Sequence, residues 1–141
     1  MTATATSETV VNPGDTVIDQ VIAKFCAGDM TLFDDMADDI DFRIDHYRDA
    51  DTDVSWQQAD TKTALMGLFA RLGEEIFPQG TRALEVQTSA LGAGWHLTRF
   101  QQQFFYGQRQ REVRSLTYII SHEAERLLDY FRETVTTIEN I

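Results

Sequence analysis

Helical periodicity of hydrophobic residues marks two long stretches within the first 80 residues and a shorter stretch between them. In the first stretch, Asp15 or Thr16 can cap a helix and Gly28 fits its end. In the second, Asp60 can act as the cap, and a Pro-Gln-Gly segment at residues 78–80 ends the pattern. The apolar positions are Val17, Ile18, Val21, Ile22, Phe25 and Cys26 in the first stretch, Met30, Phe33, Met36 and Ala37 in a shorter one, and Leu65, Leu68, Phe69, Leu72 and Ile76 in the second. These spacings predict three helices.

Alternation with a period of two predicts strands in the rest of the chain. Residues 40–47 place Ile40, Phe42, Ile44 and His46 on one face and Asp41, Arg43, Asp45 and Tyr47 on the other. An Asp-rich loop follows at residues 48–53. Four long strands are predicted over residues 82–91, 94–106, 111–121 and 127–137, with turn-forming segments between them.

Helices that precede a meander of strands indicate the α+β class with an antiparallel sheet. Long twisted strands curl, and a sheet that curls over helices leaves a hollow at its open end, where ligands commonly bind. We therefore expect a cone-shaped curved antiparallel sheet packed on three N-terminal-side helices, with a pocket.

The length of 141 residues is that of one domain. Residues 1–13 are mostly Thr, Ala, Ser and Val, so we predict a flexible N-terminal arm followed by a single domain over residues 14–141. Cys26 is the only cysteine, which excludes a disulfide framework, and its place among apolar positions indicates a buried, inert thiol. Without a signal pattern or a long apolar run, we expect a soluble cytoplasmic protein.

The net charge of −11 argues against nucleic acid or an anionic membrane as a partner. Eleven Asp residues lie within residues 29–60, which we interpret as a solvated rim. The alternative, a cation site at the crowded Asp34, Asp35, Asp38 and Asp39, lacks the glycine of an EF-hand loop. Three scattered histidines and no glycine-rich phosphate loop lead us to expect no metal and no cofactor.

Three short segments, in this order and spacing, carry a resemblance to a known superfamily. They are Phe-Cys-Ala-Gly-Asp at residues 25–29, Met-Ala-Asp-Asp-Ile-Asp-Phe at 36–42 and Leu-Asp-Tyr-Phe-Arg-Glu-Thr-Val-Thr at 128–136. The chain resembles the nuclear transport factor 2-like superfamily over roughly residues 15–137, in particular its SnoaL-like and ketosteroid isomerase-like branches. The resemblance implies the cone fold, a pocket for a small hydrophobic organic ligand and a homodimer through the open sheet face.

The superfamily contains isomerases, dehydratases, epoxide hydrolases, polyketide cyclases, ligand binders and scaffolds, so its fold implies no single reaction. The general base of isomerase-like members falls on Ile44 here, and Asp45 lies on the opposite face of the strand. The acid that closes the last strand of SnoaL-like cyclases corresponds to Thr136. These departures from the family pattern favour a non-catalytic protein.

Two other residues are the candidate catalytic groups. His46 continues the apolar face of its strand and has a suitable intrinsic pKa for a general base, although a hydrogen-bonded rim histidine is the alternative. Tyr118 aligns, within one residue, with the second, protonated acid of isomerase-like members, and its hydroxyl could donate to an oxyanion. Its alternative is a core tyrosine. His96 is placed either at an edge or in the pocket.

The candidate ligand contacts are Phe42, Ile44, Trp56, Arg99, Gln101 and Arg132. The Gln-rich strand that carries Arg99 and Gln101 could instead present a solvent-exposed or dimer-forming face, and Arg132 could pair with an acid across the sheet. The leading hypothesis is a small-molecule pocket protein that binds a hydrophobic, oxygen-bearing compound, with cofactor-free acid/base catalysis of the isomerase, cyclase, dehydratase or hydrolase type. The alternative is a non-catalytic ligand-binding or dimeric assembly module.

Overall fold

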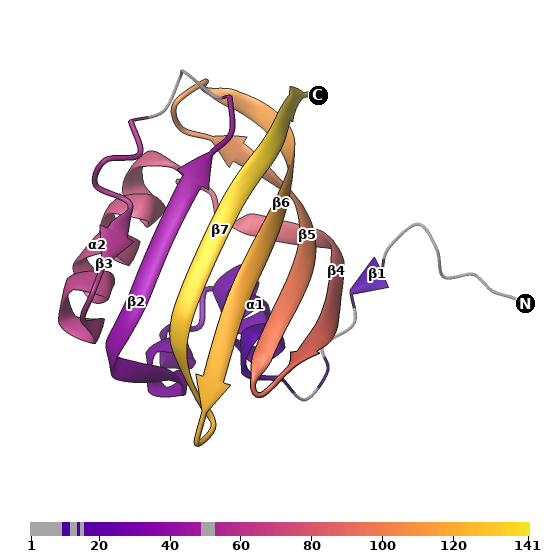
Figure 1. Ribbon diagram of the computed structural model, residues 1–141. Coiled ribbons are helices and arrows are strands. Elements are labelled where there is room, and N and C mark those ends of the chain that lie inside the picture. The colour runs from indigo at the N-terminus through magenta and orange to yellow at the C-terminus, as the bar shows by residue number, and fades with distance from the viewer. Residues whose placement is uncertain (1–9, 12–13, 15, 49–52) are drawn as a thin grey trace, which may run out of the picture.

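The computed structural model describes residues 10–11, 14, 16–48 and 53–141. Its elements are β1 (Val10–Val11), α1 (Val17–Ala27), the 3-10 helix η1 (Met30–Asp35), β2 (Met36–His46), β3 (Gln58–Ala59), α2 (Lys62–Glu75), β4 (Thr81–Gly92), β5 (Trp95–Tyr106), β6 (Arg111–Ala124) and β7 (Leu127–Asn140). This order confirms the predicted α+β class (Figure 1). The predicted arm lies outside the described residues except for β1, and so does most of the predicted Asp-rich loop.

The sheet has seven strands in the order β1-β4-β5-β6-β7-β2-β3. Strands β4 to β7 form the predicted antiparallel meander, whereas β2 lies parallel to β7 and β1 parallel to β4. The sheet is therefore mixed at these two pairs. The reason is the route of the chain: after β2 and β3 it passes through α2, enters the meander at the far side and returns beside β2 with its fourth strand.

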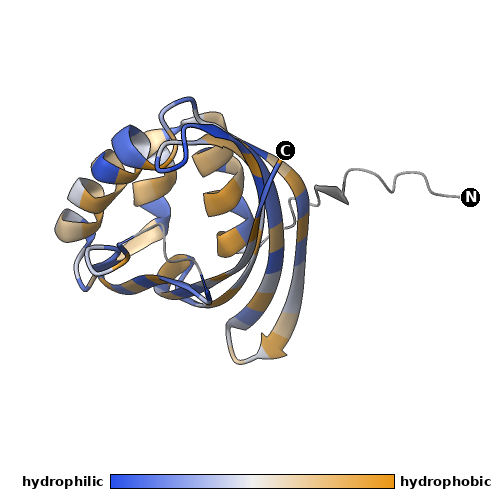
Figure 2. Ribbon diagram, turned by 90° about the horizontal axis from the view of Figure 1, so that it is seen from above, coloured by the Kyte–Doolittle hydropathy of each residue, from blue (hydrophilic) through white to orange (hydrophobic). Residues whose placement is uncertain are grey.

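The sheet curves around the helices, as the view from above shows (Figure 2). Pairing shifts by one residue between β4 and β5 and between β6 and β7, and by three residues between β2 and β7. Irregularities of this kind bend a strand and increase its twist. The helices α1 and α2 lie on the concave side, which gives the molecule its cone shape.

Local capping explains where the helices begin and end. The Thr16 side chain accepts a hydrogen bond from the Asp19 N–H at the start of α1, and Gly28 ends that helix with a φ of 69°, a conformation that favours glycine. At the start of α2 the cap is Thr61, one residue after the predicted Asp60, because the Thr61 hydroxyl is the group that accepts from the Ala64 N–H.

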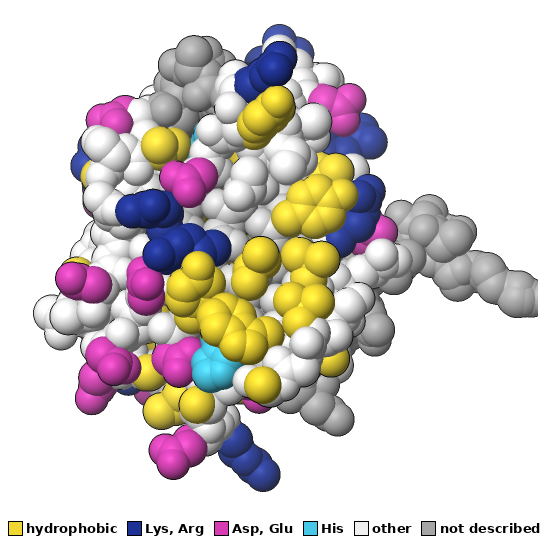
Figure 3. Space-filling model, in the orientation of Figure 1, with side chains coloured by type: hydrophobic (Ala, Val, Ile, Leu, Met, Phe, Trp, Pro, Cys, Tyr) yellow, Lys and Arg dark blue, Asp and Glu magenta, His cyan; other side chains and the backbone are white. Residues whose placement is uncertain are grey.

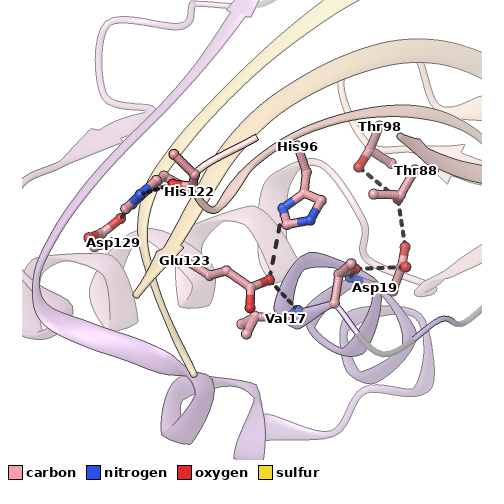
Figure 4. A network of polar contacts seen from close by, with 10 residues as sticks. Val17, Asp19, Thr88, His96, Thr98, His122, Glu123 and Asp129 are labelled. Atoms are coloured by element: carbon pink, nitrogen blue, oxygen red, sulfur yellow. Dashed lines mark hydrogen bonds and ion pairs between the residues drawn. The ribbon is translucent and has the colours of Figure 1, made fainter. Parts of the chain in front are cut away.

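A buried polar network fixes the N-terminal end of α1 to the sheet (Figure 4). The Val17 N–H donates to Glu123 Oε1 over 3.0 Å, and the Thr88 hydroxyl donates to Asp19 Oδ1 over 2.7 Å. Thr88 also lies 2.9 Å from the hydroxyl of Thr98. Because Asp19 is only 4% exposed, its bond with Thr88 is shielded from water and helps to hold α1 against the sheet.

Histidines also contribute at this end of the sheet. His122 Nδ1 bonds to Asp129 over 2.7 Å and its Nε2 to the Ala93 carbonyl over 3.1 Å, so one ring joins the β4–β5 turn to the β6–β7 hairpin (Figure 4). The hydrogen bond to the Asp129 carboxylate raises the pKa of His122 above its ordinary value. His96 Nδ1 lies 3.9 Å from Glu123 Oε1 and is buried.

The acidic segment forms ion pairs on the surface. Asp35 pairs with Lys24 at 2.8 Å, and Asp38 lies 3.5 Å from Lys62. These pairs are consistent with the interpretation of a solvated rim. No helix among the described residues has the length and apolar character needed to cross a membrane.

Candidate functional site

A cavity lies between the inner face of the sheet and the helices α1 and α2. The cavity has a volume of about 70 Å³, measured as the space open to the centre of a water molecule. Its walls consist of Val21, Ile22, Phe25, Phe42, Ile44, His46, Gln57, Phe69, Leu72, Ile76, Phe77, Phe100, Gln102, Phe104, Tyr106, Ser115, Ile119, Phe131, Glu133, Val135 and Ile138. A mostly apolar wall with a few polar groups is typical of sites for small organic molecules.

Aromatic rings form much of the wall. Phe42 of β2 stacks on Phe131 of β7 with ring centroids 4.4 Å apart, and Phe69 of α2 meets Phe42 edge-on at 5.7 Å. Phe25 of α1 packs against Phe77 at 5.3 Å. These contacts join α1, α2 and the sheet around the cavity, so the cavity has walls of defined shape.

Glu133 is the acidic group of the cavity. Its neighbours in the sheet are Ile44 on β2 and Ile119 on β6, so the carboxyl group lies in an apolar environment. Burial raises the pKa of Glu133 to about 7, although a hydrogen bond with Thr117 acts in the opposite direction. The residue as a whole is half-buried, because part of its surface borders the cavity. Near neutral pH this group can therefore donate or accept a proton.

His46 lies on the same inner face as Glu133. It pairs with Val135, while Glu133 pairs with Ile44 two residues earlier in both strands. On neighbouring parallel strands, which lie about 4.8 Å apart, an offset of two residues places the two Cα atoms roughly 8 Å apart. Both residues line the cavity, so two titratable groups belong to one pocket.

Gln57 brings an amide to the cavity from the segment before β3. It is 2% exposed, and its Nε2 has no hydrogen-bond partner among the described residues. Gln102 and Ser115, which face each other across β5 and β6, add two further buried polar groups. Among the described residues that line the cavity there is no Lys and no Arg.

Three of the residues predicted from the sequence border this cavity. Phe42, Ile44 and His46 project from β2 into it, on the face that alternation assigned to the interior. Trp56 does not line the cavity. It packs at the edge of the core, with the Arg71 guanidinium 4.1 Å above its ring.

The other predicted residues lie on the outer face of the sheet, away from the cavity. Tyr118 is 38% exposed and its hydroxyl accepts from Arg99, which also donates to Glu85 over 2.8 Å. Gln101 faces outward on the same strand as Arg99. The structure therefore does not bring His46 and Tyr118 together, because Ile119 occupies the inner position on β6 and a shift of one residue reverses the face.

Arg132 forms a two-point ion pair on the outer face. It donates to both carboxylate oxygens of Asp41 on the neighbouring strand, at 2.8 and 3.2 Å. This pairing across the sheet is the alternative that the sequence left open, and it does not bring Arg132 to the cavity. The guanidinium also lowers the pKa of Asp41.

Two residues of the cavity, Glu133 and Gln57, were not among the predicted site residues. Glu133 shares a strand face with Phe131, so strict alternation could have identified it as an acid directed toward the core. Gln57 belongs to no predicted element, and we find no sequence signal that would have identified it. The described residues hold no group of three or more His, Cys, Asp or Glu side chains that could bind a metal ion.

Comparison of the sequence alone with known proteins identifies no relative. No family model matches the sequence, and no curated protein matches it. The structure, in contrast, is similar to many solved structures.

An NTF2-like protein from Anabaena variabilis is 11% identical and superposes with a TM-score of 0.66, covering 96% of this chain and 95% of its own. An LEH-like epoxide hydrolase from M. tuberculosis is 12% identical, with a TM-score of 0.61 and coverage of 84% and 79%. A protein assigned as a SnoaL-like polyketide cyclase from Mesorhizobium loti is 12% identical, with a TM-score of 0.57 and coverage of 83% and 94%. This chain therefore has the nuclear transport factor 2-like cone fold that SnoaL-like proteins share, as the resemblance in the sequence predicted.

Proposed function

We propose that this protein binds a hydrophobic, oxygen-bearing compound in the cavity and transfers a proton on it without a cofactor. The observation that carries the proposal is the pair of titratable side chains, His46 and Glu133, on one face of two neighbouring strands that border an apolar cavity. Such a pair distinguishes a reactive pocket from an ordinary gap in the core.

The two groups suit opposite roles. A neutral His46 takes a proton from carbon or water, and protonated Glu133 gives its proton to an oxygen of the same compound. Exchange with solvent then returns both groups to their starting states. Isomerisation, cyclisation, dehydration and hydrolysis all include such paired proton transfers, which accompany the bonds that the compound itself forms or breaks. Glu133 takes the donor role that the sequence analysis assigned to Tyr118.

Native mass spectrometry of gently purified protein tests binding. We expect a reproducible extra mass from a small molecule on the wild-type chain, because the cavity is preformed. Val135→Phe fills the cavity and should lose that mass. Thr134→Phe, its neighbour on the outer face of β7, should keep it. A wild-type protein that carries no molecule and takes up no added apolar fragment contradicts the proposal.

The identified compound then allows a test of catalysis. We expect His46→Ala and Glu133→Gln each to lower turnover by about 100-fold or more, as removal of a general acid or base usually does. A His46→Ala variant that stays folded and fully active would remove His46 from the mechanism.

A second candidate function, homodimeric assembly, is favoured by a different surface. The outer face of β5 and β6 exposes four large hydrophobic side chains, namely Trp95, Leu97, Tyr118 and Ile120. Leu97 pairs with Ile120 and Arg99 with Tyr118, so this apolar patch is continuous across the two strands (Figure 3). Continuous apolar patches of this kind mark interaction surfaces. A second copy of the chain is the proposed occupant, because an apolar patch on the outer face of a sheet can meet itself across a two-fold axis.

A further inference from the structure

Gln57 is a lining residue of the cavity with a buried side-chain nitrogen that has no hydrogen-bond partner among the described residues. Its side chain is almost fully buried. A buried donor without an acceptor lowers the stability of the folded protein, so native proteins rarely keep one that has no function. The unsatisfied amide N–H thus points to an acceptor that the ligand supplies.

The backbone holds this amide in place on both sides. The Gln57 N–H donates to the Val54 carbonyl over 2.9 Å, and the Gln57 carbonyl accepts from the Ile44 N–H over 2.9 Å. The next two residues pair with β2 as strand β3. Because the main chain is fixed, the side-chain donor is positioned before a ligand arrives, which reduces the entropy lost on binding.

The charges around the cavity restrict the ligand further. No Lys or Arg lies among the described lining residues. The predicted contacts Arg99 and Arg132 pair instead with acids on the outer face. His46 is the lining side chain that can become a cation, and Glu133 lies diagonal to it. A carboxylate or phosphate in this cavity would lose its hydration without a guanidinium or ammonium partner, which is unfavourable.

We propose that Gln57 determines specificity, with its amide N–H donating to a carbonyl-type oxygen of an uncharged organic ligand. This inference rests on the proposed function, because it requires that the cavity open to a small molecule. It adds the class of ligand, neutral and acceptor-bearing, and the residue that recognises the acceptor.

Three probes of similar shape test the inference: acetophenone, which is neutral and has a carbonyl, ethylbenzene, which has no acceptor, and benzoate, which is anionic. Binding is measured by NMR titration of the full chain. We expect Gln57→Leu to weaken acetophenone binding about threefold to tenfold, the usual effect of one neutral hydrogen bond. Ethylbenzene should bind the variant at least as tightly as the wild type, and benzoate should bind the wild type about tenfold more weakly than acetophenone.

Gln58→Leu is the matched control, because Gln58 is an exposed neighbour that does not line the cavity. It should leave the order of the three probes unchanged. Gln57→Met, which keeps the length of the side chain, replaces Gln57→Leu if the leucine variant does not fold. An equal loss of acetophenone and ethylbenzene binding would assign Gln57 a packing role only and overturn the inference. The inference also fails if benzoate binds best.

The outcomes separate this inference from the proposed function. If ethylbenzene binds the wild type and acetophenone has no advantage, the cavity is a binding site but Gln57 does not select the ligand. If neither neutral probe binds, the proposed function fails and this inference fails with it.

Discussion

At the residue scale, Glu133 links stability to the chemistry of the cavity. A carboxyl group whose pKa rises from the ordinary 4.5 to about 7 on folding binds its proton more tightly in the folded protein. Its contribution to stability is therefore complete below about pH 4.5 and declines as the pH rises through 7. The group suits proton transfer for the same reason that it costs stability at high pH: its neighbours in the sheet, Ile44 and Ile119, cannot solvate a charge.

We predict that Glu133→Gln removes this dependence on pH. As the pH rises from 4.5 to 8, the wild type should lose unfolding free energy relative to the variant, by an amount on the order of 3 kcal/mol. Urea unfolding at several pH values measures the difference. Glu139→Gln, at an exposed position of the same strand, is the control. A difference that stays constant with pH would show that Glu133 is as well solvated as a surface carboxylate.

At the element scale, the β5–β6 turn holds the C-terminal end of α2. The Gly107 N–H donates to the Ile76 carbonyl over 3.1 Å, and Gly107 lies directly against the carbonyl group of Glu75. The helix end that this contact positions contributes Leu72 and Ile76 to the cavity wall. The turn thus helps to set the distance between α2 and the sheet.

We predict that Gly107→Ala destabilises the protein by about 2 kcal/mol or more, because the new Cβ would overlap the Glu75 carbonyl group. Gly73→Ala, within α2 and with open space around it, should instead stabilise the fold by about 0.5–1 kcal/mol. Thermal unfolding of the two variants measures both effects. Equal stabilities of the two variants would mean that the turn does not rest against the helix.

At the scale of the whole molecule, the two faces of the sheet differ in what they carry. The inner face surrounds the cavity, while the outer face combines the apolar patch with the ion pairs Arg99–Glu85 and Arg132–Asp41. A pocket and an assembly surface can therefore coexist in one small domain, and the two candidate functions are compatible with each other.

We predict that the wild-type chain is a dimer at concentrations of about tens of micromolar. Ile120→Lys should raise the dissociation constant of the dimer by at least about tenfold, because burial of an ammonium group without a partner is unfavourable. Ile120 is 42% exposed in a single chain, so the substitution should leave the fold intact. Met66→Lys, on the exposed side of α2, is the control and should not change association. Sedimentation equilibrium measures the dissociation constants. A wild-type monomer at all concentrations would contradict this use of the patch.

Much of the fold could be predicted because local pattern and tertiary structure agree. Sequence and structure agree on the apolar stripes of α1 and α2, on the end of α1 at Gly28 and on the alternation of buried and exposed residues in β2. The parallel pairing of β2 with β7 was not predicted, because the two strands are far apart in the chain and alternation carries no direction.

The site was only partly predictable. His46, Phe42 and Ile44 follow from alternation within one strand, whereas Tyr118 was placed from a resemblance whose alignment was uncertain by one residue. On a strand, an error of one residue moves the predicted side chain to the opposite face of the sheet. Glu133 was not proposed, because its chemistry depends on residues of two other strands.

The sequence by itself determined which residues form helices and strands and which side chains turn inward, since both follow from the geometry of a single element. Only the tertiary structure decided what those side chains meet. Burial between Ile44 and Ile119 raises the pKa of Glu133, and the route of the chain before β3 brings the Gln57 amide into the cavity. The raised pKa and the position of the amide both arise from contacts between distant segments. The spacing of apolar residues within one segment contains no information about those contacts.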